Sequence, residues 1–157
     1  MSLKALPTAD AVAKLIASLV GKNVTAKAGA VLKQLPKGGA AAVCVDEAPN
    51  VVAVMLADVS LAAAVGAALA MIPPAAAQDA VRAGSLPPNI ADNFREVANI
   101  MCSLLTASGG RGVRLADFEV GNLPAAAVPV LAGAGARRDL EIDVQNYGKG
   151  LLAIIAA

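Results

Sequence analysis

A carboxylate and a carboxamide, Glu96 and Asn99, stand three residues apart in a segment with helical periodicity. Three residues along an α-helix place two side chains on neighbouring turns of one face. A carboxylate pairs with a cation, whereas an amide both donates and accepts hydrogen bonds and can fix the orientation of a water molecule. The helix can therefore present the two groups together as one rigid unit.

The helix that carries this pair is predicted to begin after Pro87 and Pro88, with Asn89 as its N-cap. Apolar residues at helical spacing form a stripe that we expect to be buried: Ile90, Phe94, Val97, Met101, Leu104 and Leu105. A polar stripe lies two residues out of phase, about 200° around the helix: Asp92, Glu96, Asn99 and Ser103. The polar stripe is therefore expected to face solvent.

Asp92 and Ile100 flank the pair on the same helix. A capping or first-turn role is expected for Asp92, because anions favour helix N-termini. Ile100 is the apolar residue on the polar arc, and we expect it to contact a partner. A partly covered surface isoleucine, which is common in folded proteins, is the alternative.

Composition bounds the class of protein. The 157 residues suffice for one domain, and a mean hydropathy of +0.65 predicts a strong core, built mainly from aliphatic residues because aromatics are 2%. A net charge of +1 gives no basic field, so nucleic acid is not an expected partner. The absence of histidine excludes Ser-His-Asp and Cys-His catalysis, histidine zinc sites and phosphohistidine transfer.

Cys44 and Cys102 fall in apolar surroundings and are expected to be buried free thiols, with a disulfide as the alternative. Lys14 interrupts the first apolar run, so no signal peptide is expected. The long apolar run 51–72 is interpreted as a buried strand followed by a helix, because Asp58 and Ser60 interrupt it; a membrane span is the alternative. The expected compartment is the cytoplasm.

The pattern along the chain predicts an α+β domain with one mostly antiparallel sheet and long helices packed against it. Thr8 and Gly21 are expected to cap the first helix. Expected helices span 10–20, 60–72, 74–83 and the segment from Asn89 to Thr106. Expected strands span 40–45, 51–57, 113–120, 128–132, 140–144 and 150–155, with one or two more within 22–35.

The two halves of the chain resemble each other, so residues 1–157 are interpreted as one domain of two pseudo-repeats, about 8–72 and 89–157. Residues 10–17 align with residues 92–99. In this alignment Lys14 stands where Glu96 does and Ala17 stands where Asn99 does. The scaffold is repeated, but the polar pair is not, so one functional face is expected.

The pattern Asp92-x3-Glu96-x2-Asn99 on a helix, followed by Pro124, resembles the signature of the CheC/CheX/FliY family of chemotaxis phosphatases. The resemblance extends over most of the chain, because the family also has duplicated helix-plus-strands halves. The spacing from Asn99 to Pro124 is slightly longer than usual in the family. With one intact motif, the chain is more similar to CheX than to the two-site CheC.

The resemblance implies hydrolysis of the aspartyl phosphate of a CheY-like response-regulator receiver domain. The motif helix would insert into the receiver's active site, where Asn99 would orient the attacking water and Glu96 would pair with the receiver's lysine. Asp92 and Ile100 would lie at the partner interface. The receiver would supply Mg²⁺, and the protein would need no cofactor of its own. Sheet-edge dimerisation in CheX-type proteins implies a possible homodimer, for which the run Leu151 to Ile155 is the expected strand.

Two other functions remain open at this point. One is a non-catalytic module that binds a receiver domain as a scaffold, and the other is a sensor of a small ligand. Segment 133–135 lacks the third glycine of a dinucleotide loop, and segment 108–112 lacks the lysine and hydroxyl residue of a phosphate-binding loop. Both segments are therefore interpreted as flexible connections.

Overall fold

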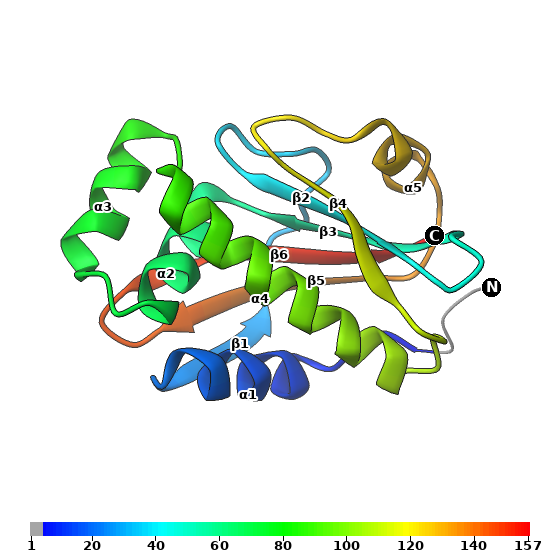
Figure 1. Ribbon diagram of the computed structural model, residues 1–157, viewed down its shortest axis with the longest axis horizontal. Coiled ribbons are helices and arrows are strands. Elements are labelled where there is room, and N and C mark those ends of the chain that lie inside the picture. Colours follow the sequence, from blue (N-terminus) through cyan, green and yellow to red (C-terminus); the bar gives the residue numbers. More distant parts are fainter. Residues whose placement is uncertain (1–4) are drawn as a thin grey trace.

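One antiparallel sheet forms the centre of the molecule (Figure 1). The structure is a computed structural model that describes residues 5–157. The six strands lie in the order β1-β5-β6-β3-β2-β4, and every neighbouring pair is antiparallel. The strands are β1 (Val24–Ala28), β2 (Ala40–Val45), β3 (Val51–Ala57), β4 (Arg114–Val120), β5 (Arg137–Val144) and β6 (Gly148–Ala156).

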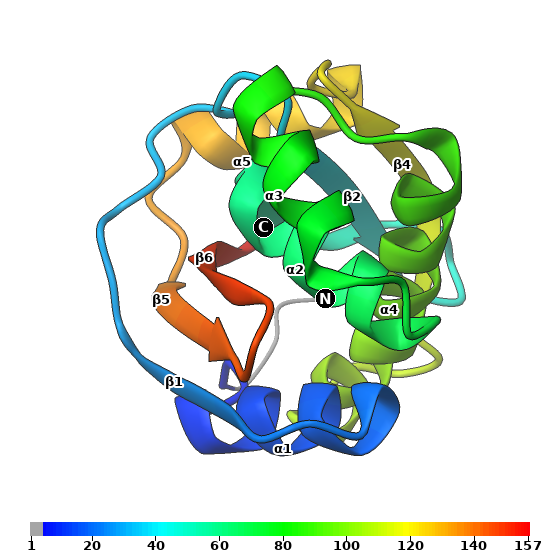
Figure 2. The same ribbon diagram turned by 90° about the vertical axis from the view of Figure 1, so that its left-hand side faces the viewer.

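Helices cover one face of this sheet, and a loop with two short helical turns covers the other. Figure 1 shows α4 running diagonally across the first face, and Figure 2 shows α2 between α1 and α3. The helical elements are α1 (Ala9–Val20), α2 (Val59–Leu69), α3 (Pro74–Ala83), α4 (Pro88–Ala107), the 3₁₀ turn η1 (Ala125–Ala127) and α5 (Val128–Ala132). The predicted α+β class is confirmed.

The core has two layers, because successive residues of a strand point to opposite faces. In β2, Ala42 and Cys44 face the helices, whereas Ala41 and Val43 face η1 and the loop that contains Leu32. Every residue of β2 is buried. Burial on both faces explains why this strand and β3 are continuous apolar runs without a polar alternation.

Local signals place several elements as predicted. The Thr8 hydroxyl accepts a 3.1 Å hydrogen bond from the Ala11 amide at the start of α1, and Gly21 ends that helix in the left-handed conformation. The bounds of β2, β3 and α3 coincide with the predictions. The run 51–72 divides into β3 and the short helix α2, which Asp58 caps. Within residues 5–157, no helix is long and apolar enough to cross a bilayer.

Two predictions about strands of the second half were wrong. Residues 128–132 form the helix α5 and not a strand. Pro129 explains this, because proline has no amide hydrogen for a strand ladder but fits the first turn of a helix. The C-terminal run Leu151 to Ile155 is not an edge: it belongs to β6, which pairs with β3 on one side and β5 on the other. The edges of the sheet are β1 and β4.

The strand order relates the two halves of the chain. If β1 is exchanged with β4, β2 with β5 and β3 with β6, the order reads the same in reverse. α1 packs beside β1 at one edge, and α4 packs beside β4 at the other. The two aligned helices therefore occupy equivalent places at opposite edges of one sheet.

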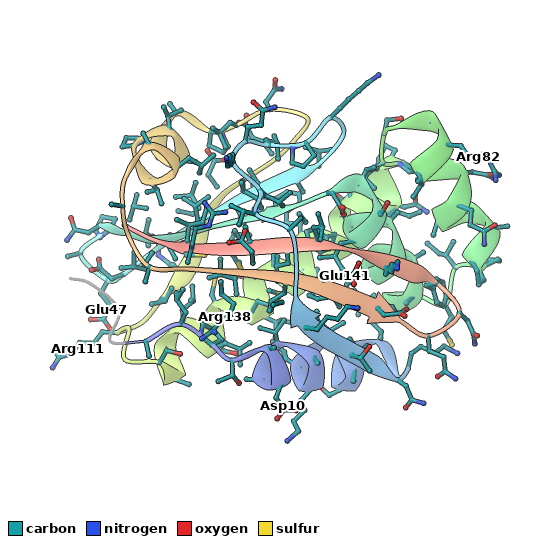
Figure 3. The ribbon with its side chains drawn as sticks, turned by 180° about the vertical axis from the view of Figure 1, so that it is seen from behind. Asp10, Glu47, Arg82, Arg111, Arg138 and Glu141 are labelled. Atoms are coloured by element: carbon teal, nitrogen blue, oxygen red, sulfur yellow. The ribbon has the colours of Figure 1, made fainter. Side chains whose placement is uncertain are left out.

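Side-chain hydrogen bonds from β5 hold the loop between β1 and β2 over the second face of the sheet. The Arg137 guanidinium bonds both carboxylate oxygens of Asp139 at 2.7 Å and donates to the Leu32 carbonyl oxygen at 2.9 Å. Asp139 accepts a 3.2 Å hydrogen bond from the Leu32 amide. On the same strand, Arg138 donates to the Pro7 carbonyl oxygen at 3.1 Å and so fastens the segment before α1 (Figure 3).

Candidate functional site

Helix α4 presents Glu96 and Asn99 to solvent. The opposite side of α4 is buried, which confirms the predicted apolar stripe, although Leu104 is only half-buried. Three residues separate the pair, so the two side chains leave the helix about 4.5 Å apart along its axis and about 60° apart around it. Within residues 5–157, neither side chain forms a hydrogen bond or an ion pair with the rest of the chain. Both groups are therefore available to a partner.

The start of α4 differs from the prediction. Pro87, not Asn89, occupies the N-cap position, and no side chain caps the helix. Pro88 is already helical, because its fixed φ is suited to the first position and its missing amide hydrogen costs nothing there. Asp92 consequently lies in the second turn, where it is exposed, and the expected capping or first-turn role for it was wrong.

Ile100 lies next to Asn99 with 36% of its surface exposed. It is among the few large apolar side chains that the described part of the chain leaves in solvent. An exposed isoleucine beside two unpaired polar groups offers a contact surface of mixed character. Asp92, Glu96, Asn99 and Ile100 thus all lie on the outer side of one helix.

A close crossing with α2 fixes the place of α4. A Cβ atom added to Gly66 would lie 2.4 Å from the Ile90 carbonyl oxygen, so only glycine permits this approach. The Asn93 amide group donates a 2.9 Å hydrogen bond from Nδ2 to the Gly66 carbonyl oxygen. This role was not predicted from the sequence, where its only signal is a polar residue at the margin of the apolar stripe.

Pro124, the last residue of the sequence motif, does not join the pair. It is buried and precedes η1, whose Ala127 packs in the layer of the core on the opposite face from α4. Its position indicates a structural role at the end of the turn that connects β4 to η1. The chemistry available on α4 therefore rests on side chains of the helix itself.

The equivalent face of α1 has different chemistry. Lys14 is exposed and forms a 3.0 Å ion pair with Asp10, whose side chain points outward (Figure 3). Ala17 is half-buried. Such an exposed i,i+4 pair contributes only a few tenths of a kcal/mol. Helix α1 therefore has the same place in the fold as α4, but Lys14 and Ala17 replace the carboxylate and the amide.

Metal-binding side chains do not gather in this region. Among residues 5–157, no three cysteine, aspartate or glutamate residues are close enough together to hold a metal ion. The two cysteines are free thiols, both buried, as predicted. The candidate site consists of exposed side chains of α4, where the cation Arg95 lies beside Glu96 in the chain.

Comparison with known proteins gives no match to a protein-family model or to a curated protein. Solved structures do match in fold. The FliM middle domain from H. pylori has a TM-score of 0.66 at 12% identity, covering 94% of this chain and 84% of that one. Thermotoga maritima FliY has a TM-score of 0.64 at 14% identity, covering 92% and 81%.

A third match is the structure of a CheX-CheY-BeF₃-Mg²⁺ complex from Borrelia burgdorferi, with a TM-score of 0.54 and 13% identity. The match covers 94% of this chain and 92% of that one. At these identities the likeness establishes the fold. It extends over nearly the whole length of this chain.

Proposed function

We propose that this chain, which has the fold shared by CheX, FliY and the FliM middle domain, is a phosphatase for the aspartyl phosphate of a CheY-like receiver domain. The observation that carries the proposal is the exposed, unpaired couple of Glu96 and Asn99 on α4. The solved complex of CheX with CheY supports the proposal, because CheX has the same fold and is bound to CheY in that structure.

The chemistry needs positioning more than a covalent intermediate. The Asn99 amide accepts from and donates to a water molecule and aligns it with the phosphorus. The water oxygen forms a bond to phosphorus as the bond from phosphorus to the aspartyl oxygen breaks. The products are inorganic phosphate and the free aspartate of the receiver. Glu96 pairs with the receiver's lysine and sets the register of docking. Mg²⁺ belongs to the receiver and neutralises charge on the phosphoryl oxygens.

Phosphate release from receiver domains charged with acetyl phosphate tests this proposal. Asn99→Ala is expected to lower kcat by about 100-fold, because the water loses its orientation. Glu96→Ala is expected to raise KM by about tenfold or more, because docking loses an ion pair. Lys14→Ala, the matched change on α1, is expected to leave both constants unchanged. Normal turnover by both α4 variants would contradict the proposal.

The second candidate is a module that binds a receiver without hydrolysis. Two observations favour it. Helix α1 occupies the equivalent place in the fold but lacks the carboxylate and amide that α4 carries as Glu96 and Asn99. The FliM middle domain also gives a higher TM-score to this chain than CheX does. The same assay separates the candidates. Saturable binding of the phosphorylated receiver, with its phosphate lifetime unchanged, would assign the binding role. A shortened lifetime that depends on Asn99 would assign the phosphatase role.

A further inference from the structure

Cys44 and Cys102 face each other between the sheet and α4. Cys44 lies on β2 and Cys102 lies on α4, and their sulfur atoms are 3.5 Å apart. Both side chains are buried, with 0% and 1% of the residue surface exposed. The chain has two cysteines in all, so each thiol has a single possible partner within the molecule. The contact joins residues that are 58 positions apart in the sequence.

The backbone around Cys44 is irregular against both neighbouring strands. The register of β2 with β3 shifts between Cys44 and Val45, and the register with β4 shifts between Val43 and Cys44. A shift of this kind interrupts the ladder and bends the strand locally. The two sulfur atoms must approach by about 1.5 Å to reach a bonding distance of about 2.05 Å. The irregular segment is where the sheet can yield by that amount.

We propose that Cys44 and Cys102 form an oxidisable pair that a hydroperoxide converts into a disulfide, which ties α4 covalently to β2. One thiol loses its proton, and the thiolate attacks the hydroxyl oxygen of the peroxide; the O–O bond breaks, and the leaving oxygen takes up that proton, which gives a sulfenic acid and a water or an alcohol. The second thiol attacks the sulfur of the sulfenic acid, the S–O bond breaks, and the hydroxyl group leaves as water with the proton of the second thiol. Two electrons pass from sulfur to the peroxide, which is the oxidant consumed.

Burial and the contact between the two thiols affect the rate of these steps. The hydrogen bond with Cys102, together with burial, raises the pKa of Cys44. The hydrogen bond with Cys44 lowers the pKa of Cys102, although burial opposes this. The thiol that ionises attacks the peroxide, and the other thiol, 3.5 Å away, then attacks the sulfenic acid. Since both sulfurs are buried, the oxidant reaches them only when α4 opens locally, and oxidation is slower than that of an exposed thiol.

The pair is close to the candidate site, because Cys102 follows Asn99 by three residues on the same helix. A bond at Cys102 draws that turn of α4 toward β2 and restricts its motion. The consequence for hydrolysis rests on the proposed function. If α4 docks into a receiver, then the oxidised form dephosphorylates the receiver at a rate different from that of the reduced form.

Hydrogen peroxide added to the folded protein tests the pair directly. The intact mass is expected to fall by about 2 Da, the mass of two hydrogen atoms. A digest without reductant is expected to contain a peptide that links Cys44 to Cys102, and a dithiol reductant restores both the mass and two alkylatable thiols. Cys44→Ala and Cys102→Ala serve as matched controls, because neither can lose 2 Da within one chain. Retention of two free thiols, or a disulfide only between chains, overturns the proposal.

The receiver assay is a separate arm of the test. The mass change establishes the disulfide whether or not the protein hydrolyses a phosphate. A difference in turnover between oxidised and reduced protein, absent in Cys44→Ala, supports the link to the site. If the disulfide forms but receiver dephosphorylation stays unchanged, then the disulfide does not affect the candidate site. The proposal that the two cysteines are oxidisable would still hold. Absence of turnover in both states contradicts the proposed function and not the pair.

Discussion

The side-chain amide of Asn93 donates a 2.9 Å hydrogen bond to the main-chain carbonyl oxygen of Gly66. This bond and the missing side chain of Gly66 let α4 lie directly against α2. The contact is at the margin of the buried side of α4, where Asn93 is half-buried, whereas Glu96 and Asn99 are exposed. The crossing therefore supports the candidate site without taking part in its chemistry.

Gly66→Ala is expected to lower the free energy of unfolding by about 1–3 kcal/mol. The added Cβ would lie 2.4 Å from the Ile90 carbonyl oxygen and 2.8 Å from its Cγ2, and Ile90 is only 1% exposed. Intrinsic helix propensity favours alanine over glycine by about 1 kcal/mol, so the sign of the change is diagnostic. Urea denaturation measures it, and a gain in stability would contradict the close crossing.

Asn93→Ala is expected to lower the free energy of unfolding by about 1 kcal/mol, because the Gly66 carbonyl oxygen loses its side-chain donor. Asn99→Ala is the matched control: it is the same chemical change six residues later on the same helix, at an exposed residue. The control is expected to change stability by less than about 0.5 kcal/mol. Equal effects of the two substitutions in chemical denaturation would contradict the assigned bond.

Elements with strong local signals were predictable from the sequence. β2 and β3 are apolar runs bounded by loop residues, and α3 lies between Pro74 and Gly84, so their ends were correct. The error at α5 came from the β-branched residues around Pro129, which suggest a strand until the missing amide hydrogen is considered. The central position of β6 depends on strand order, which the apolar pattern alone does not encode.

Asp139→Asn is expected to destabilise the protein at neutral pH. Burial opposes the charge of Asp139, but hydrogen bonds from Arg137 and from the Leu32 amide outweigh it and lower the pKa. A carboxyl group with a lowered folded-state pKa stabilises the fold above its ordinary value of 3.8, and the contribution is lost as the pH falls through the lowered value. Denaturation series from pH 7 downward should show the difference from wild type shrinking below about pH 4.

Asp58→Asn is expected to have the opposite effect on how stability depends on pH. Burial raises the pKa of Asp58, so the folded state binds the proton more tightly than the unfolded state. The charge therefore costs stability as the pH rises from 3.8 through the raised value. Asparagine retains an oxygen for the Leu61 amide without the charge. Relative to wild type, the variant should gain stability as the pH rises through this range. Parallel plots of unfolding free energy against pH for the two proteins would contradict a raised pKa at Asp58.

Ile100→Ser is expected to raise the KM for a phosphorylated receiver by about tenfold and to leave kcat unchanged, because burial of the side chain in a complex is worth about 1.5 kcal/mol. Val81→Ser is the matched control, since Val81 is 41% exposed but lies on α3. The control should bind the receiver normally. Steady-state kinetics of phosphate release give both constants, and equal effects of the two substitutions would contradict a contact at Ile100.

The candidate site was only partly predictable. The helical spacing of Glu96 and Asn99 was enough to place both on the outer face, because the apolar stripe fixes which side of α4 is buried. The bond between Asn93 and Gly66 and the contact between Cys44 and Cys102 join residues that are distant in the sequence. Such contacts depend on how helices cross the sheet, and no local pattern specifies that crossing.

The order of the strands also determines when the sheet can close during synthesis. A nascent chain that has emerged as far as residue 83 contains β1, but β1 pairs only with β5, at residues 137–144. β3 likewise waits for β6, the last strand of the chain, as its second neighbour. The halves therefore interlock and do not mature one after the other at the ribosome. The long-range pairings that complete the sheet form only after β5 and β6 have left the ribosome.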